Sequence, residues 1–323
     1  MITKEDFFTK YNITEESFQA AEISWEELCL IYDDYSVNKF VKYEKILEDF
    51  TNTYLKPLSR GNSTENKNKE EVKVHSIRSR VKNAEHLLEK IIRKKQRNET
   101  KYRKLDNVNY EKFITDIIGI RCLILFKEDW KGIHEYITSN FENNPKYYIR
   151  DSVQDFDEDE KHYYIAEEPK VHIRDGDSRK IYEDILSPDH IIDGRDYRSV
   201  HYIIKYKGIY LEIQVRTLFE EGWGEIDHTI VYPYYKKDPV LEEYTQLLNR
   251  LSGLADEMGG FFYKIKQLEI EHLANQKERE NLEEKDEHVR DKTEISLQKE
   301  QRMQEYVDKV ITPESCLQAV LNE

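Results

Sequence analysis

Hydrophobic residues recur along the chain with two different periods, and the change of period divides the sequence into three parts. Over residues 1–57 the apolar and aromatic residues return every three or four positions, as at Trp25, Leu28, Tyr32 and Tyr35. This spacing places them on one face of a helix. The polar stretch SRGNSTENKNKEE follows Pro57 and predicts a linker or loop. The first part, residues 1–71, is therefore predicted to be a helical extension that ends in a linker.

The central part, residues 72–235, mixes strand and helix patterns. IRCLILF is apolar and rich in branched residues, as is typical of a buried strand. KEDWKGIHEYITSNF has the period of a helix. YRSVHYIIKYKGIYLEIQVRT has strand-like segments on both sides of Lys207-Gly208, which predicts a β-hairpin with these two residues as the turn. These segments predict a domain that contains both strands and helices.

From about residue 239 onward the pattern is helical again. LLNRLSGLADEMGGFFYKIKQLEI is amphipathic enough to pack on another element, whereas the segment after it is mostly charged. Its apolar residues Leu282, Val289, Ile295 and Met303 do not sustain four clean heptads, which favours a long solvated helix or a helical hairpin over a coiled coil. Residues 236–323 are predicted to be a helical C-terminal extension through which the chain could form a homo-oligomer.

Composition and charge narrow the functional classes. The chain has 323 residues, enough for one large or two modest domains, and a net charge of −15, which argues against a broad nucleic-acid surface. It has no run of about 18 apolar residues, and its N-terminus lacks the apolar core of a signal peptide. Three widely separated cysteines fit a reducing compartment. We therefore expect a cytoplasmic protein with no membrane partner.

A basic segment, residues 78–104, interrupts the acidic composition. Arg80 and Lys82 are two positions apart, so both can point the same way from an extended segment. Lys90 begins a set of cationic positions that share one helical face. Arginine offers a planar fork and lysine a point charge to phosphate groups. The segment is a candidate polyphosphate site, and a solvated helix face is the alternative.

Two acidic residues are candidate metal ligands. Asp116 precedes the predicted buried strand, and Glu212 lies within LEIQVRT. Alternation places Glu212, Gln214 and Arg216 on one face of that strand and its aliphatic residues on the other. A lone carboxylate at the start of a strand is more often a cap or turn residue. Two carboxylates on neighbouring strands would suit Mg²⁺, which prefers one or two carboxylates together with substrate phosphates.

The segment RDYRSVHY carries aromatic side chains that suit a nucleotide. Tyr197 and His201 are an even number of positions apart, so they share a face of an extended chain. A tyrosine ring can stack on a base, and histidine can contact a phosphate or ribose. Ordinary aromatic packing in a half-buried strand is the alternative. Asp227 and His228 diverge too far on a helix to bind one ion, so we expect them to support the preceding strand.

These segments, in this order, resemble the synthetase domain of the RelA/SpoT family of alarmone synthetases. RSRVKNAEHLLEKIIRKK resembles the family's R-x-K…EK…RK segment, DIIGIR its D-[IL]-x-G-[IV]-R motif and YRSVHY its Y-R-S-[IL]-H motif. LEIQVRTLFEEGWGEIDHTIVY resembles its E-[IV]-Q-[IV]-R-T block. The match covers about residues 72–235 and is similar to a small alarmone synthetase. It implies an α+β fold with a nucleotidyltransferase-like mixed β-sheet flanked by helices.

The resemblance also implies an activity and a set of site residues. The activity is that of an ATP:GTP/GDP 3′-pyrophosphotransferase, which makes (p)ppGpp by Mg²⁺-dependent transfer of the β,γ-pyrophosphate of ATP to the 3′-hydroxyl of GDP or GTP. Asp116 and Glu212 match the Mg²⁺ carboxylates, and Glu212 also matches the base. The other matches are Arg80, Lys82, Lys90 and Arg121 for ATP, and Tyr197, which would stack on guanine, His201, Gln214 and Arg216 for the acceptor nucleotide.

Two other functions stay open. A toxin-type relative would pyrophosphorylate the 3′ end of tRNA or make an adenosine alarmone, which fits basic residues 90–104 and Arg195-Asp196, where the family often has Asn-Gly. An inactive nucleotide-binding or scaffold protein would use the C-terminal helix for assembly, but both acids and the cationic segment are retained. Residues 1–71 contain no histidine, so the HD hydrolase domain of longer family members is not expected.

Overall fold

The computed structural model describes residues 3–59, 74–97, 100–149, 162–174, 177–194, 197–231 and 238–310. Nearly all of the predicted linker before residue 72 and the Arg195-Asp196 pair lie outside these ranges. Contacts between residues divide the chain into two units, Met1–Phe261 and Phe262–Glu323.

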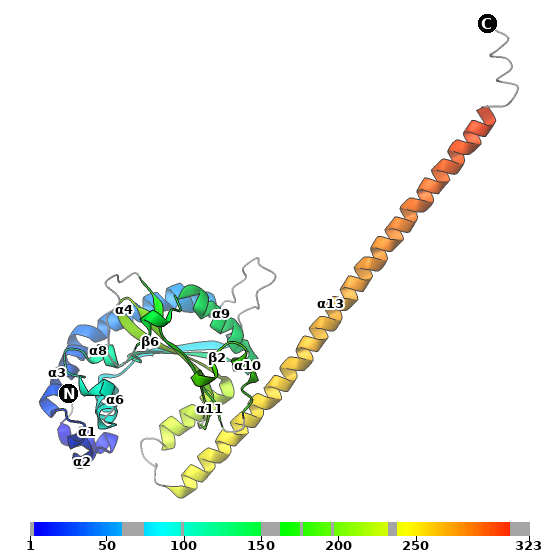
Figure 1. Cartoon of the computed structure of the whole chain (residues 1–323). Helices are drawn as coiled ribbons and strands as arrows, with labels where there is room; N and C mark the ends of the chain where they lie inside the picture. The colour runs from blue at the N-terminus through cyan, green and yellow to red at the C-terminus, as the bar shows by residue number, and fades with distance from the viewer. Residues whose placement is uncertain are drawn as a thin grey trace, which may run out of the picture. The chain divides into compact units, whose positions relative to one another are not determined.

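The first unit is built around a six-stranded β-sheet (Figure 1). Strand β2 pairs in parallel with β6, and β3 pairs in parallel with β4, whereas the other neighbours are antiparallel. This mixed sheet, flanked by helices, confirms the predicted α+β fold class. The strands, in spatial order, are β1 (Ser76–Val81), β2 (Ile118–Ile124), β6 (Ile209–Thr217), β5 (Ser199–Tyr206), β3 (Tyr164–His172) and β4 (Ile191–Ile192).

The hairpin between β5 and β6 confirms the predicted hairpin with Lys207-Gly208 as its turn. Lys207 and Gly208 form its turn with φ angles of 47° and 76°. Two successive positive φ angles are typical of a type I′ turn, whose twist matches that of the flanking strands. Glycine adopts such an angle at little steric cost. The two-residue loop fixes the register of the hairpin and so places His201 opposite Gln214.

Strand alternation gives the sheet one apolar and one polar face. Ile120 and Cys122 on β2, Leu211 and Ile213 on β6, and Tyr202 on β5 are buried on the apolar face. The register aligns the residues between them across the strands, so that Arg80 lies opposite Gly119 and Gly119 opposite Glu212. The polar face carries Arg78 and Arg80 on β1, Arg121 on β2, Glu212, Gln214 and Arg216 on β6, and His201 on β5.

The N-terminal residues form the predicted helices, but two π-helical segments interrupt them. These segments, Asp34–Lys39 and Thr51–Leu55, follow the third and fourth helices. A π-turn accommodates one more residue than an α-turn. The extra residue lets Tyr35, Tyr43 and Phe50 all face the core. The helices are α1 (Lys4–Tyr11), α2 (Glu15–Gln19), α3 (Trp25–Asp33), α4 (Phe40–Phe50) and α5 (Lys56–Ser59).

Helices α4 and α9 (Trp130–Asn140) cover the apolar face, and α11 (Leu218–Ile226) lies on the other side of the sheet (Figure 1). The indole nitrogen of Trp130 donates a hydrogen bond to the Tyr202 hydroxyl over 2.9 Å. The ring of Phe50 meets the ring of Tyr206 edge-on with centroids 5.1 Å apart. The remaining elements of this unit are α6 (Ala84–Gln96), α7 (Thr100–Arg103), α8 (Tyr110–Phe113), α10 (Lys180–Glu183), three 3₁₀ turns (Lys127–Asp129, Pro145–Tyr147 and Pro188–His190) and a π-turn (Asp227–Val231).

The C-terminal part is one continuous helix, α13 (Pro239–Val310), rather than the helical hairpin that the sequence left open. Its first turns are attached to the first unit by a buried ionic network. Arg198 lies 2.7 Å from Asp256 on α13 and 2.8 Å from Asp177. Arg174 pairs with Glu220 and donates to the Asn249 side chain over 2.5 Å. Within the described ranges, no helix combines the length and the hydrophobicity needed to cross a bilayer.

The network contains more carboxylates than guanidinium groups. This excess of negative charge determines how the stability of the network changes with pH. Asp177, Glu220 and Asp256 share the two guanidinium groups of Arg174 and Arg198. Burial raises the pKa of Asp256 to about 6, although the charge of Arg198 opposes the shift. Between the ordinary aspartate pKa and this value, the folded chain therefore retains a proton that the unfolded chain releases.

We predict that this proton makes the network less stabilising as the pH rises. Relative to an Asp256→Asn variant, the wild-type free energy of unfolding should fall between about pH 4 and pH 6, by about 3 kcal/mol in all, and then stay level. Urea unfolding of both proteins across this range measures the difference. An exposed control, Asp189→Asn, should show no such trend, and a difference that rises with pH would contradict the prediction.

Candidate active site

The parallel pairing of β2 and β6 brings the two predicted acids into one cluster. Asp116 lies two residues before β2, and Glu212 lies on β6 opposite Gly119. The charge of Asp116 opposes the net lowering of the Glu212 pKa, so the two carboxylates lie within electrostatic range of each other. Among the described residues, no group of three or more His, Cys, Asp and Glu side chains is arranged to hold a metal ion.

Asp116 is the centre of an ionic cluster with two lysines. Its Oδ2 atom lies 3.0 Å from the Lys82 ammonium and 2.5 Å from the Lys90 ammonium. Burial alone would raise the pKa of Asp116, but Lys90 and Lys82 outweigh it and lower the pKa to about 2. The carboxylate is therefore ionised at neutral pH. Its Oδ1 atom is buried and accepts no hydrogen bond from the described protein.

Local structure explains why both lysines reach Asp116. Lys82 follows β1, and its backbone N–H donates to the Ile117 carbonyl over 2.8 Å, which extends the β1–β2 pairing to the position next to Asp116. The Tyr35 hydroxyl donates to the Lys82 carbonyl over 2.6 Å. Asn83 caps α6, which starts at once and carries Lys90 on its second turn. The N-terminal helices therefore help to position the cluster.

Glu212 is held by polar neighbours on the same sheet face. The Gln214 side chain donates to Glu212 Oε2 over 2.7 Å, and His201 Nδ1 lies 3.5 Å from Oε1. Burial would raise the pKa of Glu212, but the hydrogen bond and charge of His201 bring it below its usual value. The side chain is thus an ionised carboxylate oriented by donors, which is the state that a proton acceptor requires.

Arginines on the polar face converge on one acid that the sequence reasoning missed. Glu221, on α11, lies 2.9 Å from Arg121, 3.6 Å from Arg78 and 3.5 Å from Arg216. Arg121 also pairs with Glu225. Glu221 and Glu225 are four positions apart on the helix that follows LEIQVRT, and this spacing next to Arg216 was the available signal. Arg80 lies on the same edge of the sheet and is exposed.

Three rings gather at the other end of the polar face. The ring centroids of Tyr197 and His172 are 5.4 Å apart, and those of His172 and His201 are 4.6 Å apart. Tyr197 and His201 lie 6.2 Å apart with nearly parallel planes. The shared face of Tyr197 and His201 was expected, but His172 was not. His172 comes from β3, and the sequence does not reveal which strand pairs with β5.

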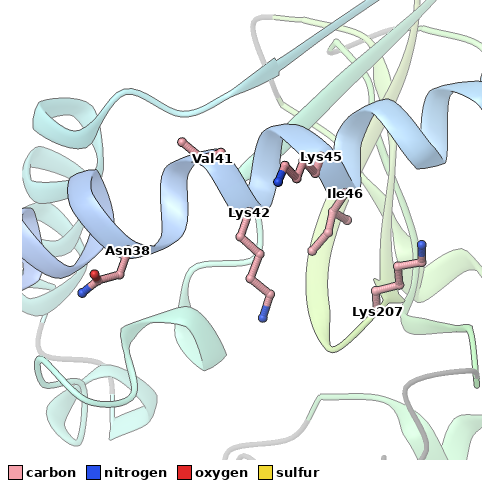
Figure 2. A pocket seen from close by; sticks show the side chains of 6 residues that line it. All are labelled: Asn38, Val41, Lys42, Lys45, Ile46 and Lys207. Atoms are coloured by element: carbon pink, nitrogen blue, oxygen red, sulfur yellow. The ribbon is translucent and has the colours of Figure 1, made fainter.

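The structure also has a cavity of about 430 Å³ away from this cluster. Figure 2 shows it between α4 and the turn of the β5–β6 hairpin, on the side of the sheet that α4 covers. It contains none of the predicted site residues. Its lining consists of Asn38, Val41, Lys42, Lys45, Ile46 and Lys207.

Residues 79–237 match the sequence model of the region found in RelA/SpoT proteins. The chain therefore contains a RelA/SpoT region, which confirms the resemblance carried by its four motifs. No protein of curated function matches the sequence.

Solved structures that align with this chain carry related names. One is a GTP pyrophosphokinase family protein from Streptococcus pneumoniae, with 19% identity, a TM-score of 0.44 and coverage of 76% of this chain and 97% of the other. Another is small alarmone synthetase 1 from Bacillus subtilis bound to its product pppGpp, with 20% identity, a TM-score of 0.38 and coverage of 75% and 96%. The same enzyme bound to AMPCPP aligns with 18% identity, a TM-score of 0.42 and coverage of 75% and 97%.

We predict that Asp116 is needed for the stability of the cluster itself. Asp116→Asn keeps the size of the side chain but leaves Lys82 and Lys90 without a buried counter-charge. Removing one partner of such a buried pair should cost about 3 kcal/mol in the free energy of unfolding at pH 7. Because the folded pKa of Asp116 is depressed, this loss should shrink as the pH falls from about 4 towards 2. Urea unfolding with Asp184→Asn as an exposed control measures it, and an equal loss in both variants would refute the assignment.

Proposed function

We propose that this protein is an ATP:GTP/GDP 3′-pyrophosphotransferase, that is, a GTP pyrophosphokinase that makes (p)ppGpp. The observation that supports this proposal most is the position of Glu212. It is an ionised carboxylate on the polar face of a sheet, within the electrostatic range of Asp116, between a cationic edge and a cluster of rings. The RelA/SpoT region, residues 79–237, includes all ten of the residues that we assign to this site.

The cationic edge supplies the charge that transfer of a pyrophosphoryl group needs. Such transfer depends mainly on positioning and on neutralising the phosphate oxygens. We assign Arg80, Lys82, Lys90 and Arg121 to the phosphates of ATP. Lys82 and Lys90 both contact Asp116, and Arg121 lies farther along β2 beside Glu221. The cationic side chains therefore extend along β2 from Asp116 towards Glu221.

The proposed reaction takes place at the β-phosphorus of ATP. The 3′-oxygen of the acceptor forms a bond to this phosphorus, and the bond from the phosphorus to the oxygen shared with the α-phosphate breaks. AMP leaves with that electron pair, and the 3′-hydroxyl proton passes to Glu212. The hydrogen bond from Gln214 and the contact with His201 hold the Glu212 carboxylate in place for this role.

The two acids also fit a Mg²⁺ ion. Asp116 Oδ1 is a buried carboxylate oxygen with no hydrogen-bond partner among the described residues, and Asp116 and Glu212 both have pKa values below their ordinary ones. Mg²⁺ prefers one or two carboxylates together with substrate phosphates, so two acids are enough. When bound, the ion would neutralise charge on the phosphates.

The ring cluster is the proposed site of the acceptor base. Tyr197 is half-buried, and its plane is nearly parallel to that of His201, an arrangement of rings that suits stacking on a base. Gln214 and Arg216 line the same strand, and Arg216 donates to the Gln214 side chain. Arg216 would therefore approach the acceptor phosphates while Gln214 keeps Glu212 oriented.

Incubation of the protein with radiolabelled ATP, Mg²⁺ and either GDP, GTP or bulk tRNA tests the proposal. Transfer of label to a guanosine nucleotide, with AMP as the second product, is the expected result. Transfer to tRNA would instead identify the toxin-type activity. Absence of product with every acceptor would refute pyrophosphoryl transfer and leave a nucleotide-binding or scaffold role.

We predict that Glu212→Gln will reduce turnover by a factor of 100 or more, because general base catalysis contributes about 10²–10⁴-fold. Glutamine retains the size of the side chain but does not take up the proton. Initial rates and the thermal melting temperature should be measured together, with Glu44→Gln on α4 as the exposed control. Near-normal turnover in a folded variant would show that another group accepts the proton.

We predict that Tyr197→Ala will raise the KM of the acceptor nucleotide while that of ATP changes little. Loss of one stacked ring costs about 1–3 kcal/mol, which corresponds to a KM higher by a factor of roughly 5 to 150. Steady-state kinetics with each substrate varied in turn measure both constants. Tyr32→Ala, in the N-terminal helices, is the control. A parallel rise of both KM values would argue against stacking.

A further inference from the structure

Helix α13 turns large apolar side chains away from the first unit. In the part of the helix that belongs to this unit, five such residues are 44% to 67% exposed: Tyr244, Leu247, Leu251, Leu254 and Met258. Their spacing is three, four, three and four positions, so they form one continuous stripe along the helix. A contiguous apolar surface of this kind marks an interaction site rather than ordinary surface.

The opposite side of the same helix, which faces the first unit, is polar and small. Asn249, Ser252 and Asp256 are buried there, two of them in the network with Arg174 and Arg198. Gly260 permits a close approach, since a Cβ atom at this position would lie 3.0 Å from Glu128 Oε1. Directional polar contacts therefore fix the orientation of the helix and keep the apolar stripe at the surface.

The spacing of the stripe identifies its partner as another helix. Alternating steps of three and four are the a and d positions of a coiled-coil heptad. The same steps continue at Phe261, Ile265 and Leu268, which are 61%, 46% and 65% exposed. The apolar residues from Leu282 onward do not sustain clean heptads, which disfavours a coiled coil in that segment. The heptads lie before that segment, in residues 240–268.

The charges beside the stripe are complementary to those of a second copy of α13 that runs in the opposite direction. The residues that precede the a positions alternate in sign: Glu243, Arg250, Glu257 and Lys264. In an antiparallel pair these positions face each other. When Leu251 packs against Leu254 of a second copy, Arg250 faces its Glu257, and Glu243 faces its Lys264. All four charged positions then meet an opposite charge.

A parallel pair has less of this complementarity. In that arrangement Lys264 would face Glu269 of the other copy, but Arg250 would face Ala255, Glu243 would face Leu248 and Glu257 would face Phe262. The antiparallel arrangement is also closed, because every contact occurs twice about a twofold axis near residues 252 and 253.

Glu257 also has a partner in its own chain, since it lies 3.4 Å from Lys127. The Glu257 side chain remains 56% exposed, and surface ion pairs of this kind contribute little to stability, so Glu257 can exchange this partner for Arg250 of a second copy.

We propose that residues 240–268 of α13 form an antiparallel coiled coil with the same residues of a second copy of this chain. The central layers are Leu251 with Leu254 of the other copy, and Leu247 with its Met258. Each layer recurs on the other side of the twofold axis. The chain is thus a twofold dimer whose two RelA/SpoT regions are joined through α13.

The first test measures the mass of the full chain in solution. By light scattering and sedimentation at micromolar concentration, the protein should have twice the mass of one chain. The double variant Leu251→Glu/Leu254→Glu should weaken dimerisation by on the order of 100-fold or more. Leu273→Glu makes the same change at a position that is 50% exposed and outside the stripe, and it should leave the dimer intact. A monomeric wild-type protein, or a dimer that survives the double variant, would overturn the proposal.

The second test determines the direction of the pair by charge reversal. Arg250→Glu should weaken the dimer, and so should Glu257→Arg, because each places like charges opposite each other. The combined variant Arg250→Glu/Glu257→Arg should recover most of the affinity. Circular dichroism shows that each variant is folded. A combined effect equal to the sum of the two single losses would exclude the antiparallel arrangement.

The third test traps the central layers. A chain with both Leu247→Cys and Met258→Cys should form a disulfide-linked dimer on mild oxidation, and peptide mass spectrometry should show a link between the two introduced cysteines. The two positions are about 16 Å apart along one helix, so they cannot bond within a chain. Each single variant, compared with the wild-type chain and its three native cysteines, should not link through the introduced residue. Linkage in the single variant Leu247→Cys would indicate a parallel pair.

Discussion

The ion pairs of Asp116 with Lys82 and Lys90 constrain the rest of the polar face. They join three segments: the end of β1, the second turn of α6 and the residues before β2. The local sequence pattern does not indicate that these segments meet. A buried carboxylate is stable only when it has partners, so these three segments are stabilised together. One carboxylate oxygen, Oδ1, has no hydrogen-bond partner in the part of the chain that the structure describes, at a cost of about 1–3 kcal/mol, and the proposed cation would satisfy it.

Farther along the sheet, a second carboxylate, that of Glu221, balances the charge of several arginines. Three guanidinium groups, those of Arg78, Arg121 and Arg216, surround Glu221, and they would repel one another without it. Glu221 therefore keeps the cationic edge assembled before any substrate arrives. On the proposed function, the phosphates of ATP would exchange with Glu221 as the partner of Arg121. The affinity for ATP would then reflect the difference between two anions rather than the full strength of the ion pairs.

Local signals allowed the sequence to predict much of the sheet but only part of the site. The buried strand β2 and the hairpin at Lys207-Gly208 follow from patterns within about twenty residues, so they were predictable. His172 was not, because it joins the ring cluster through the pairing of a separate strand, β3. The spacing of Glu221 and Glu225 after Arg216 was a local signal, but their contacts with Arg78 and Arg121 depend on how α11 packs on the sheet. The pairing of β3 with β5 even contains two register shifts, which alternation alone does not indicate. The π-helical turns after α3 and α4 were also missed. They depend on how the helices pack against the core, which the local pattern does not show.

The amphipathic pattern of α13 was recognised, but the observed direction of its apolar face has a different physical cause. Buried ion pairs are directional, so the contact of Asp256 with Arg198 fixes which side of the helix meets the first unit. Apolar contacts are not directional, and the stripe is left available for a partner. Arg198 directly follows Tyr197, and Arg174 lies two residues after His172. The segments that hold α13 are therefore also the segments that carry the ring cluster. A partner that restrains this part of α13 would restrain the proposed acceptor site through the same two arginines.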